Sequence, residues 1–386
     1  MIYNIYKMKL KLIIPFFFIV NVLINSNTYA QSKLKDMFVD STDNSFDVSN
    51  WMLNYNGFFP LFTIITEPAV DNGIGGGVLF LNQDEAALKE GKHVAPTMYG
   101  IGGMYTGNNS WGLGAFYSGV WKQDHIRYTG VLAYSSINFY YYQTIFTGDE
   151  IKLSFNLEGL YFLQELAFKI KESRYFIGGR YSYFNYNATF KLPELPIDIP
   201  DPERDGSTGG IGPIIYFDNR DFTLTPNKGI RWYFKYVYQD NWLGSDFKYN
   251  RIDAYGIGFI DKIPKLILGF RADFRFIWDD FPFFTQPYVI LRGIPAMRYQ
   301  DKIVTVLETE ERWDFARRWS LVGFAGVGKA FSDKQAFKDY ATAWSLGTGI
   351  RYKLARLLNI YWGADIARGN EEWAFYLQFG HYWNGL

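Results

Sequence analysis

Residues 269–279, which read GFRADFRFIWD, carry the pattern that decides the fold of this chain. Apolar side chains alternate with a set that includes three charged ones, in the order Phe270, Arg271, Ala272, Asp273, Phe274, Arg275, Phe276, Ile277 and Trp278. A β-strand sends successive side chains to opposite faces, so this segment has one apolar face and one charged face. A soluble barrel points such an apolar face inward, whereas a membrane barrel points it at lipid.

The same alternation recurs in residues 151–158, 231–238 and 342–352. In the last of these segments one face carries small residues and an arginine, namely Ala343, Ser345, Gly347, Gly349 and Arg351. Small residues beside a long arginine suit a crowded barrel interior better than a wide water channel. We predict an all-β fold, a transmembrane antiparallel β-barrel. The segments number roughly 15 or 16, and bacterial single-chain barrels prefer even strand numbers, so we predict 16 strands. Residues 150–170 could form one long strand or two.

The last predicted strand covers residues 373–383, with Phe375, Leu377, Phe379 and Trp383 on one face. Lipid cannot satisfy the hydrogen-bonding groups of an open sheet edge, so we expect this strand to close the barrel. The same parity predicts that His381 points toward lipid or the membrane interface.

The composition agrees with a membrane barrel. Aromatic residues make up 20% of the chain, which is typical of alternating strands with interfacial aromatic girdles. Lysine and arginine together number 39, as do aspartate and glutamate, so no charge excess points to nucleic acid. The absence of cysteine from the sequence excludes disulfides and lipid attachment at a cysteine.

The N-terminal sequence predicts export. Three lysines, an apolar run over residues 12–24 and small residues before Gln31 indicate a signal peptide over residues 1–30, with either Met1 or Met8 as the start. That run is shorter than the roughly 20 residues of a membrane helix. Residues 31–57 are expected to form a short periplasmic lead-in, and residues 58–386 the barrel, integral to the cell outer membrane.

Enzymatic chemistry is not expected. Barrel hydrolases place a base such as histidine beside a nucleophile, and the three histidines are His93 in a polar loop, His125 at a strand end and His381. No paired histidines or cysteines indicate a metal site, and residues 73–77 form no phosphate loop because they lie within a strand pattern. No cofactor is therefore predicted.

Four motifs from residue 212 onward resemble those of the Omp85 superfamily of outer-membrane barrels, the group that includes BamA- and TamA-like surface antigens. The first is a strand end with a turn: Asp218, Arg220, Asp221, Pro226 and Gly229. The second is the loop motif Leu291, Arg292 and Gly293, expected between the eleventh and twelfth strands. The third is Glu310 with Arg312, and the fourth is Gly347, Gly349, Arg351 and Asp365. Earlier strands match only in type.

The resemblance implies a late loop that folds into the lumen, where its arginine pairs with carboxylates on the next two strands. A buried guanidinium needs such a partner, because its desolvation costs several kcal/mol. Glu310 is the predicted partner of Arg292, and Gly293 would allow a tight turn. The family's second carboxylate position is occupied by Gly326 in this chain, so the pairing is expected to be weaker or to use another acid. The alternative interpretation of Arg292 and Gly293 is an ordinary surface turn.

The resemblance also implies periplasmic POTRA repeats, yet only about 27 residues precede the first predicted strand after the signal peptide. The first functional hypothesis is therefore an Omp85-like barrel that inserts or translocates proteins or lipids, with a partner supplying the periplasmic domains. Expected contacts are outer-membrane lipid and lipopolysaccharide, and periplasmic or outer-membrane assembly proteins. The alternatives are a passive outer-membrane pore or transport channel, which predicts a wide lumen, and a structural or surface-antigen barrel.

Overall fold

The structure is a computed structural model that describes residues 37–54, 58–67, 69–82, 95–144, 150–191 and 203–385. The predicted signal peptide and His93 lie outside the described residues.

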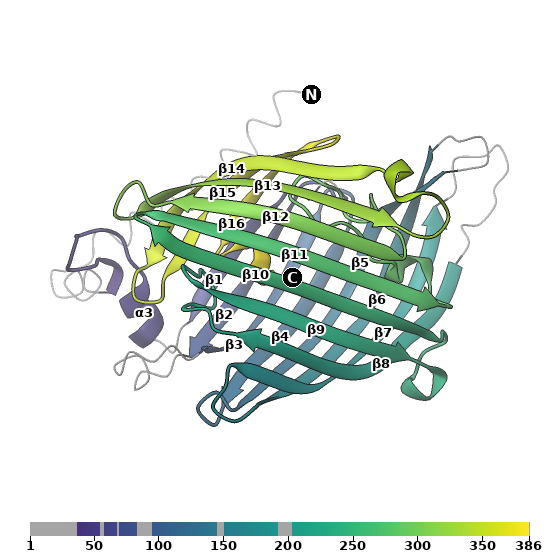
Figure 1. The fold of residues 1–386 in the computed structure, drawn as a ribbon, viewed down its shortest axis with the longest axis horizontal. Coiled ribbons are helices and arrows are strands. Elements are labelled where there is room, and N and C mark those ends of the chain that lie inside the picture. Colours follow the sequence, from purple (N-terminus) through teal and green to yellow (C-terminus); the bar gives the residue numbers. More distant parts are fainter. Residues whose placement is uncertain are drawn as a thin grey trace, which may run out of the picture.

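Sixteen strands form one antiparallel sheet, in which each strand is hydrogen-bonded to the next along the chain (Figure 1). The predicted strand number is therefore confirmed. The first eight strands are β1 (Phe59–Ile65), β2 (Gly73–Asn82), β3 (Thr97–Thr106), β4 (Trp111–Trp121), β5 (Ile126–Thr144), β6 (Glu150–Lys169), β7 (Tyr175–Lys191) and β8 (Glu203–Asp218). The others are β9 (Gly229–Gln239), β10 (Tyr249–Ile263), β11 (Leu266–Asp279), β12 (Ile303–Trp313), β13 (Trp319–Phe331), β14 (Thr342–Ala355), β15 (Ile360–Gly369) and β16 (Trp373–Phe379).

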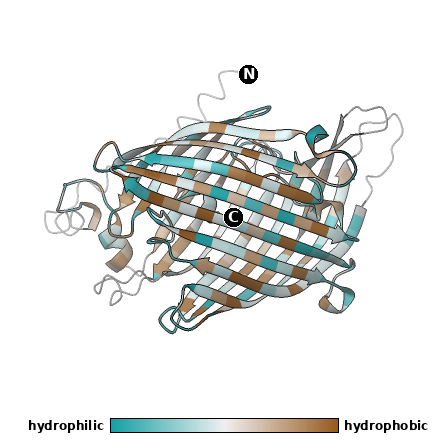
Figure 2. Cartoon of the chain, viewed as in Figure 1, coloured by the Kyte–Doolittle hydropathy of each residue, from teal (hydrophilic) through white to brown (hydrophobic). Residues whose placement is uncertain are grey.

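The alternation that predicted the fold is present in the strands. On β11 the side chain of Phe270 is 49% exposed, whereas Arg271 and Asp273 are 2% and 5% exposed. Figure 2 shows hydrophobic and hydrophilic residues alternating along the strands in the foreground. Residues 150–169 form a single long strand, β6, because each residue of β5 pairs with one of β6 without a break. We call the end of the barrel where β1 begins the basal end, and the opposite end the distal end.

The first and last strands meet at an incomplete seam. Among the described residues, the ladder joins every strand to its neighbour in sequence, and β1 and β16 are left as the two ends of the sheet. Both strands have 7 residues. The rings of Phe59 and Phe379 stack across the seam with centroids 5.3 Å apart. The last strand therefore lies beside the first, as predicted for the strand that closes the barrel, but no ladder of hydrogen bonds joins the two among the described residues.

The C-terminus departs from the sheet at Gly380. This glycine has φ +74°, a left-handed conformation that ends the strand, and a 3-10 helix, η4 (Tyr382–Gly385), follows. The prediction that His381 faces lipid is also wrong, because its side chain is buried and its Nε2 lies 3.1 Å from a carboxylate oxygen of Glu310. Trp383 is 2% exposed and donates its indole N–H to Glu308 at 2.8 Å. The contacts of His381 and Trp383 with carboxylates inside the barrel hold both side chains in the lumen. The alternation of the strand therefore does not continue beyond Gly380.

Residues 37–54 pack against the basal end of the barrel. They end in the short helix α3 (Ser49–Asn54), whose Met52 joins an apolar cluster with Val48, Leu81, Leu358 and Ile360. The backbone N–H of Val48 donates to the carbonyl of Leu354 at 2.9 Å. In the described part of the chain no helix has the length and apolar character needed to span a membrane.

Candidate functional site

The connection between β11 and β12, residues 280–302, enters the barrel and carries the loop motif. It contains one turn of 3-10 helix, η2 (Phe283–Thr285). Three of its side chains, Val289, Leu291 and Ile294, are buried in a cluster with residues of β12, β13 and β14. Apolar contacts therefore hold the loop on the inner wall, and they place Arg292 in the interior of the barrel.

Arg292 is the centre of a buried ionic cluster. Its side chain is 0% exposed and donates hydrogen bonds to Asp365 at 2.9 Å and to Glu308 at 3.0 Å. A third carboxylate, Glu310, lies 2.6 Å from the guanidinium. Burial disfavours the charge, but the surrounding carboxylates outweigh it and raise the pKa of Arg292. The guanidinium also lies over the ring of Phe324, 3.4 Å from its centroid.

The structure explains how the chain manages with Gly326 in place of an acid. In the ladder Gly326 is directly opposite Glu308, so the carboxylate comes from the same level of the adjacent strand. A Cβ atom at position 326 would lie 2.6 Å from the Cδ2 of Leu291. The glycine thus leaves room for the loop, while Glu308 and Asp365 supply the charge.

Two glycines of the late-strand motif make room for the same cluster. A Cβ at Gly349 would lie 1.9 Å from the Oδ1 of Asp365, and one at Gly347 would lie 2.2 Å from the Phe324 ring. Arg351 forms an ion pair with Asp365 at 2.5 Å. The motif therefore holds the acid that faces Arg292.

Further cations and acids complete the cluster. Arg271 pairs with Glu308 at 2.8 Å and with Asp273 at 2.5 Å. Each acid that faces Arg292 thus has a second partner: Arg271 and Trp383 for Glu308, His381 for Glu310, and Arg351 for Asp365. Such a network of paired groups stabilises one geometry of the loop.

The strand-end motif forms a separate group at the basal end. Arg220 binds the carboxylate of Asp218 through two hydrogen bonds of 2.9 and 3.0 Å. The carboxylate of Asp221 accepts three backbone N–H groups of its own turn, including that of Asn227 at 2.9 Å. Gly229 has φ +104°, which favours glycine, and Pro226 precedes it in the turn. The turn also binds the C-terminal segment, since the N–H of His381 donates to the carbonyl of Leu224 at 2.8 Å.

Arg312, which was grouped with Glu310 in the sequence, does not contact the loop arginine. It pairs with Asp314 at 3.1 Å, donates to Asn227 and lies over the ring of Tyr361. Its position on β12 points it toward the basal turns. It therefore links the β12 strand to the turn between β8 and β9.

The sequence did not indicate that the loop reaches both sides of the seam. On the β1 side, the carboxylate of Glu67 accepts the N–H of Ala296 at 3.1 Å. On the β16 side, the hydroxyl of Tyr376 accepts the N–H of Gly293 at 2.8 Å, and Arg298 pairs with Glu371 at 2.8 Å. These contacts join residues far apart in sequence, and no local pattern marks them.

Glu67 makes one of these contacts sensitive to pH. Burial raises its pKa from 4.5 to about 7, so the folded state binds more protons than the unfolded state between those values. Stability should therefore fall as the pH rises from about 4.5 through 7. Because the side chain keeps some contact with solvent, the expected change is only about 1 kcal/mol. Melting temperatures of wild type and Glu67→Gln, measured from pH 4.5 to 8, should converge at low pH and diverge above 7. Parallel curves would contradict this assignment.

Comparisons with known proteins locate the fold. The sequence matches no protein-family model and no curated protein. Among solved structures, BamA from Haemophilus ducreyi lacking POTRA domains 1–3 aligns with a TM-score of 0.54 and 12% identity, over 84% of this chain and 70% of that one. CdiB from Acinetobacter baumannii aligns with a TM-score of 0.52 and 10% identity, over 83% of this chain and 59% of that one. CdiB from Escherichia coli aligns with a TM-score of 0.55 and 9% identity, over 83% of this chain and 61% of that one.

The fold is thus the barrel of BamA and CdiB, as the Omp85-like motifs predicted. The chain spans less than two thirds of the length of either CdiB structure, at 59% and 61%.

Proposed function

We propose that this protein is an Omp85-type barrel of the cell outer membrane that inserts or translocates proteins or lipids. The observation that carries the proposal is the seam, where β1 and β16 end the sheet without a ladder between the described residues. An unpaired strand edge is a template for another strand. A substrate strand can add to such an edge without first breaking a full ladder.

The interior of the barrel supports the same proposal. The loop that carries Arg292 contacts Glu67 beyond β1 and Tyr376 on β16, so it bridges the two sides of the seam from within. For the seam to open, the loop must therefore release its contact either with Glu67 or with Tyr376. The loop and the C-terminal segment also fill part of the lumen, which favours this function over a passive pore.

The proposed function implies which molecules the barrel contacts in the outer membrane. The lipid-facing wall would contact outer-membrane lipid and lipopolysaccharide. Periplasmic or outer-membrane assembly proteins would deliver the substrate. The basal end would face the periplasm, since residues 37–54 follow the predicted signal peptide and pack there.

Cross-linking tests whether the seam must open. Phe59→Cys with Phe379→Cys introduces two thiols into a chain without cysteine, at rings that stack across the seam. A short bis-maleimide linker should abolish function in cells that depend on this variant. The matched control is Tyr99→Cys with Tyr117→Cys, a stacked pair on the laddered strands β3 and β4. Equal function of both cross-linked proteins would contradict the proposal.

Depletion tests the function itself. Quantitative proteomics of the outer membrane after loss of this protein should show a broad fall in other barrels or surface proteins, if proteins are the substrate. Lipid analysis of the same membranes covers the lipid alternative. An unchanged protein and lipid composition would reject the proposed function and leave a pore or structural barrel.

A further inference from the structure

The inner wall formed by β1–β5 differs in chemistry from the rest of the lumen. It lines an open cavity of about 520 Å³. No charged residue lines this cavity in the described part of the chain, and seven of its lining residues are glycines, among them Gly75, Gly102 and Gly112. Elsewhere the inner wall is ionic, as at Arg180 and Glu165. We call this cavity the glycine chamber.

The glycine chamber lies inside the barrel, as strand parity shows. Ala133 of β5 is opposite Gly114 of β4 and has the parity of Arg127, whose side chain binds Asp218 inside the basal mouth. Outward-facing residues of these strands, such as Phe62 and Ile74, are also apolar and more than half exposed. At the glycine chamber both faces of the wall are therefore apolar. Lipid accounts for the outer face. Among the described residues nothing covers the apolar inner face, which would meet water there unless a ligand binds to it.

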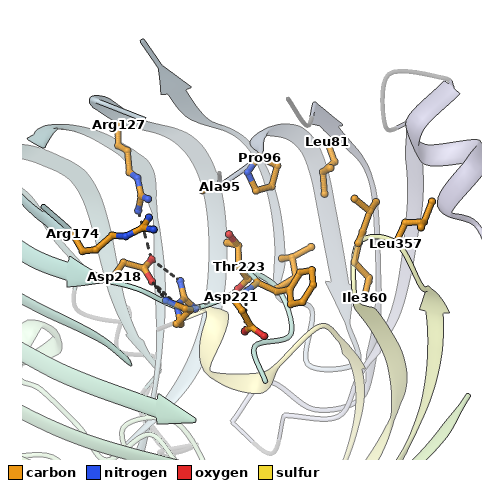
Figure 3. Close-up of a pocket in the computed structure, with 14 residues that line it drawn as sticks. Leu81, Ala95, Pro96, Arg127, Arg174, Asp218, Asp221, Thr223, Leu357 and Ile360 are labelled. Atoms are coloured by element: carbon orange, nitrogen blue, oxygen red, sulfur yellow. Dashed lines mark hydrogen bonds and ion pairs between the residues drawn. The ribbon is translucent and has the colours of Figure 1, made fainter. Parts of the chain in front are cut away.

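A cationic cleft lies next to the glycine chamber at the basal mouth (Figure 3). Leu79 lines the chamber, and Leu81, on the same strand and the same face, lines the cleft. Figure 3 shows Arg127 and Arg174 converging on Asp218 from one side of the cleft, with Leu81 and Ile360 on the other. The enclosed space of the cleft is about 50 Å³, which suits a small polar group and is too small for a chain.

The cleft has one cation without an acidic partner among the described residues, Arg174. Its lining includes the cations Arg127, Arg174 and Arg220 but only the carboxylates Asp218 and Asp221. Asp221 is used by the backbone of its own turn. Arg127 pairs with Asp124 at 2.6 Å and lies 3.6 Å from Asp218, which Arg220 binds at 2.9 Å. The cation that remains is the exposed Arg174, whose guanidinium has no ion-pair partner among the described residues. A guanidinium beside such a cluster suits a carboxylate or phosphate of a ligand.

We propose that the lumen binds one anionic amphiphile, with its acyl chain in the glycine chamber and its carboxylate or phosphate head group at Arg174 and Arg220. The volume of the chamber lies within the range of small-molecule sites, which is roughly 300–1,000 Å³. The chamber supplies the apolar contact, and the cleft supplies the charge at one end. The proposal is independent of whether the seam opens, so it stands or falls apart from the proposed function.

Native mass spectrometry of the delipidated full-length protein in a nonionic detergent tests this site. The probes are palmitate, lysophosphatidylglycerol and, as a neutral chain, hexadecanol. Wild type should bind one anionic probe at least tenfold more tightly than hexadecanol. Preference for palmitate assigns a carboxylate ligand, and preference for lysophosphatidylglycerol a phosphate one. Equal binding of all three probes would overturn the proposal.

Matched variants separate the lumen from the lipid-facing wall. Ala133→Phe fills the glycine chamber and should lower the affinity for the anionic probes at least tenfold. Ala115→Phe, on the lipid-facing side of β4, should leave it unchanged. Arg174→Gln should lower the affinity for the anionic probes tenfold and leave that for hexadecanol unchanged. Ser135→Leu, on the same inner wall, replaces Ala133→Phe if that variant does not fold. Wild-type affinity in both the chamber variant and Arg174→Gln would overturn the proposal.

Discussion

Replacement of Arg292 by alanine is expected to destabilise the barrel by about 3 kcal/mol or more, because it removes one partner of a fully buried ionic cluster. Three carboxylates face this side chain, which is 0% exposed. Each keeps a second partner, so the barrel should still fold while the loop loses its anchor. Urea unfolding in detergent, followed by tryptophan fluorescence, measures the first effect, and protease cleavage of residues 286–300 measures the second.

Arg298→Ala is the control for Arg292→Ala, since it lies in the same loop. The side chains of Arg298 and its partner Glu371 are 15% and 37% exposed, and ion pairs that solvent can reach contribute roughly 0–1 kcal/mol. The two variants should therefore differ by at least 2 kcal/mol. If Arg292→Ala shows wild-type stability, protease resistance and activity, the ionic cluster does not hold the loop, and Arg292 is an ordinary loop residue.

Strand alternation made the barrel predictable, whereas its closure was not. The alternation of residues such as Phe270 and Arg271 indicates which face of the strand each side chain is on, and each strand can be recognised separately from its own sequence. Closure depends on whether the first and last strands pair, which no local pattern encodes. One glycine with positive φ, Gly380, turns the end of the chain inward, and its conformation could not be recognised from sequence.

The candidate site was predictable only in part. The sequence singled out Arg292 and Glu310, which lie 2.6 Å apart, and Asp365 as a motif residue. It did not identify Glu308, although this residue is two positions from Glu310 and therefore on the same face. Its role depends on the register that sets it opposite Gly326. The contacts of Glu67 and Trp383 join distant segments and need the folded barrel to be seen.

Arg318→Ala should release residues 37–54 from the basal end and destabilise the protein by about 2 kcal/mol, since charged hydrogen bonds contribute roughly 1.5–3 kcal/mol each. This arginine lies in the turn between β12 and β13, is 4% exposed in its side chain, and binds Asp40, Asp43 and Asp47 at 2.6, 2.6 and 2.5 Å. Its loss leaves several carboxylates close together. Proteolysis of residues 37–54, followed by mass spectrometry, and urea unfolding measure the outcome.

The pH dependence of this contact is distinguishable from that of Glu67. A hydrogen bond from Arg356 lowers the pKa of Asp40, and one from Arg318 lowers the pKa of Asp43, both from 3.8. Carboxyl groups with lowered pKa contribute stability above their ordinary pKa and lose it only as the pH falls through the lowered value. The segment should therefore stay bound at pH 5–8, where Glu67 titrates. Release of residues 37–54 in wild type at pH 5 would contradict this assignment.

Arg317→Ala is a closely matched control, because Arg317 precedes Arg318 in the same turn. Its side chain is 66% exposed and lies 3.7 Å from Asp43, so its replacement should change stability by less than about 1 kcal/mol. A general effect of lost positive charge at this turn would affect both variants equally. An effect of Arg318→Ala that Arg317→Ala lacks would show that the acidic residues of segment 37–54 bind the basal end through Arg318. That segment also packs against Leu81 and Phe59, beside the seam and the cationic cleft, so its release would expose both.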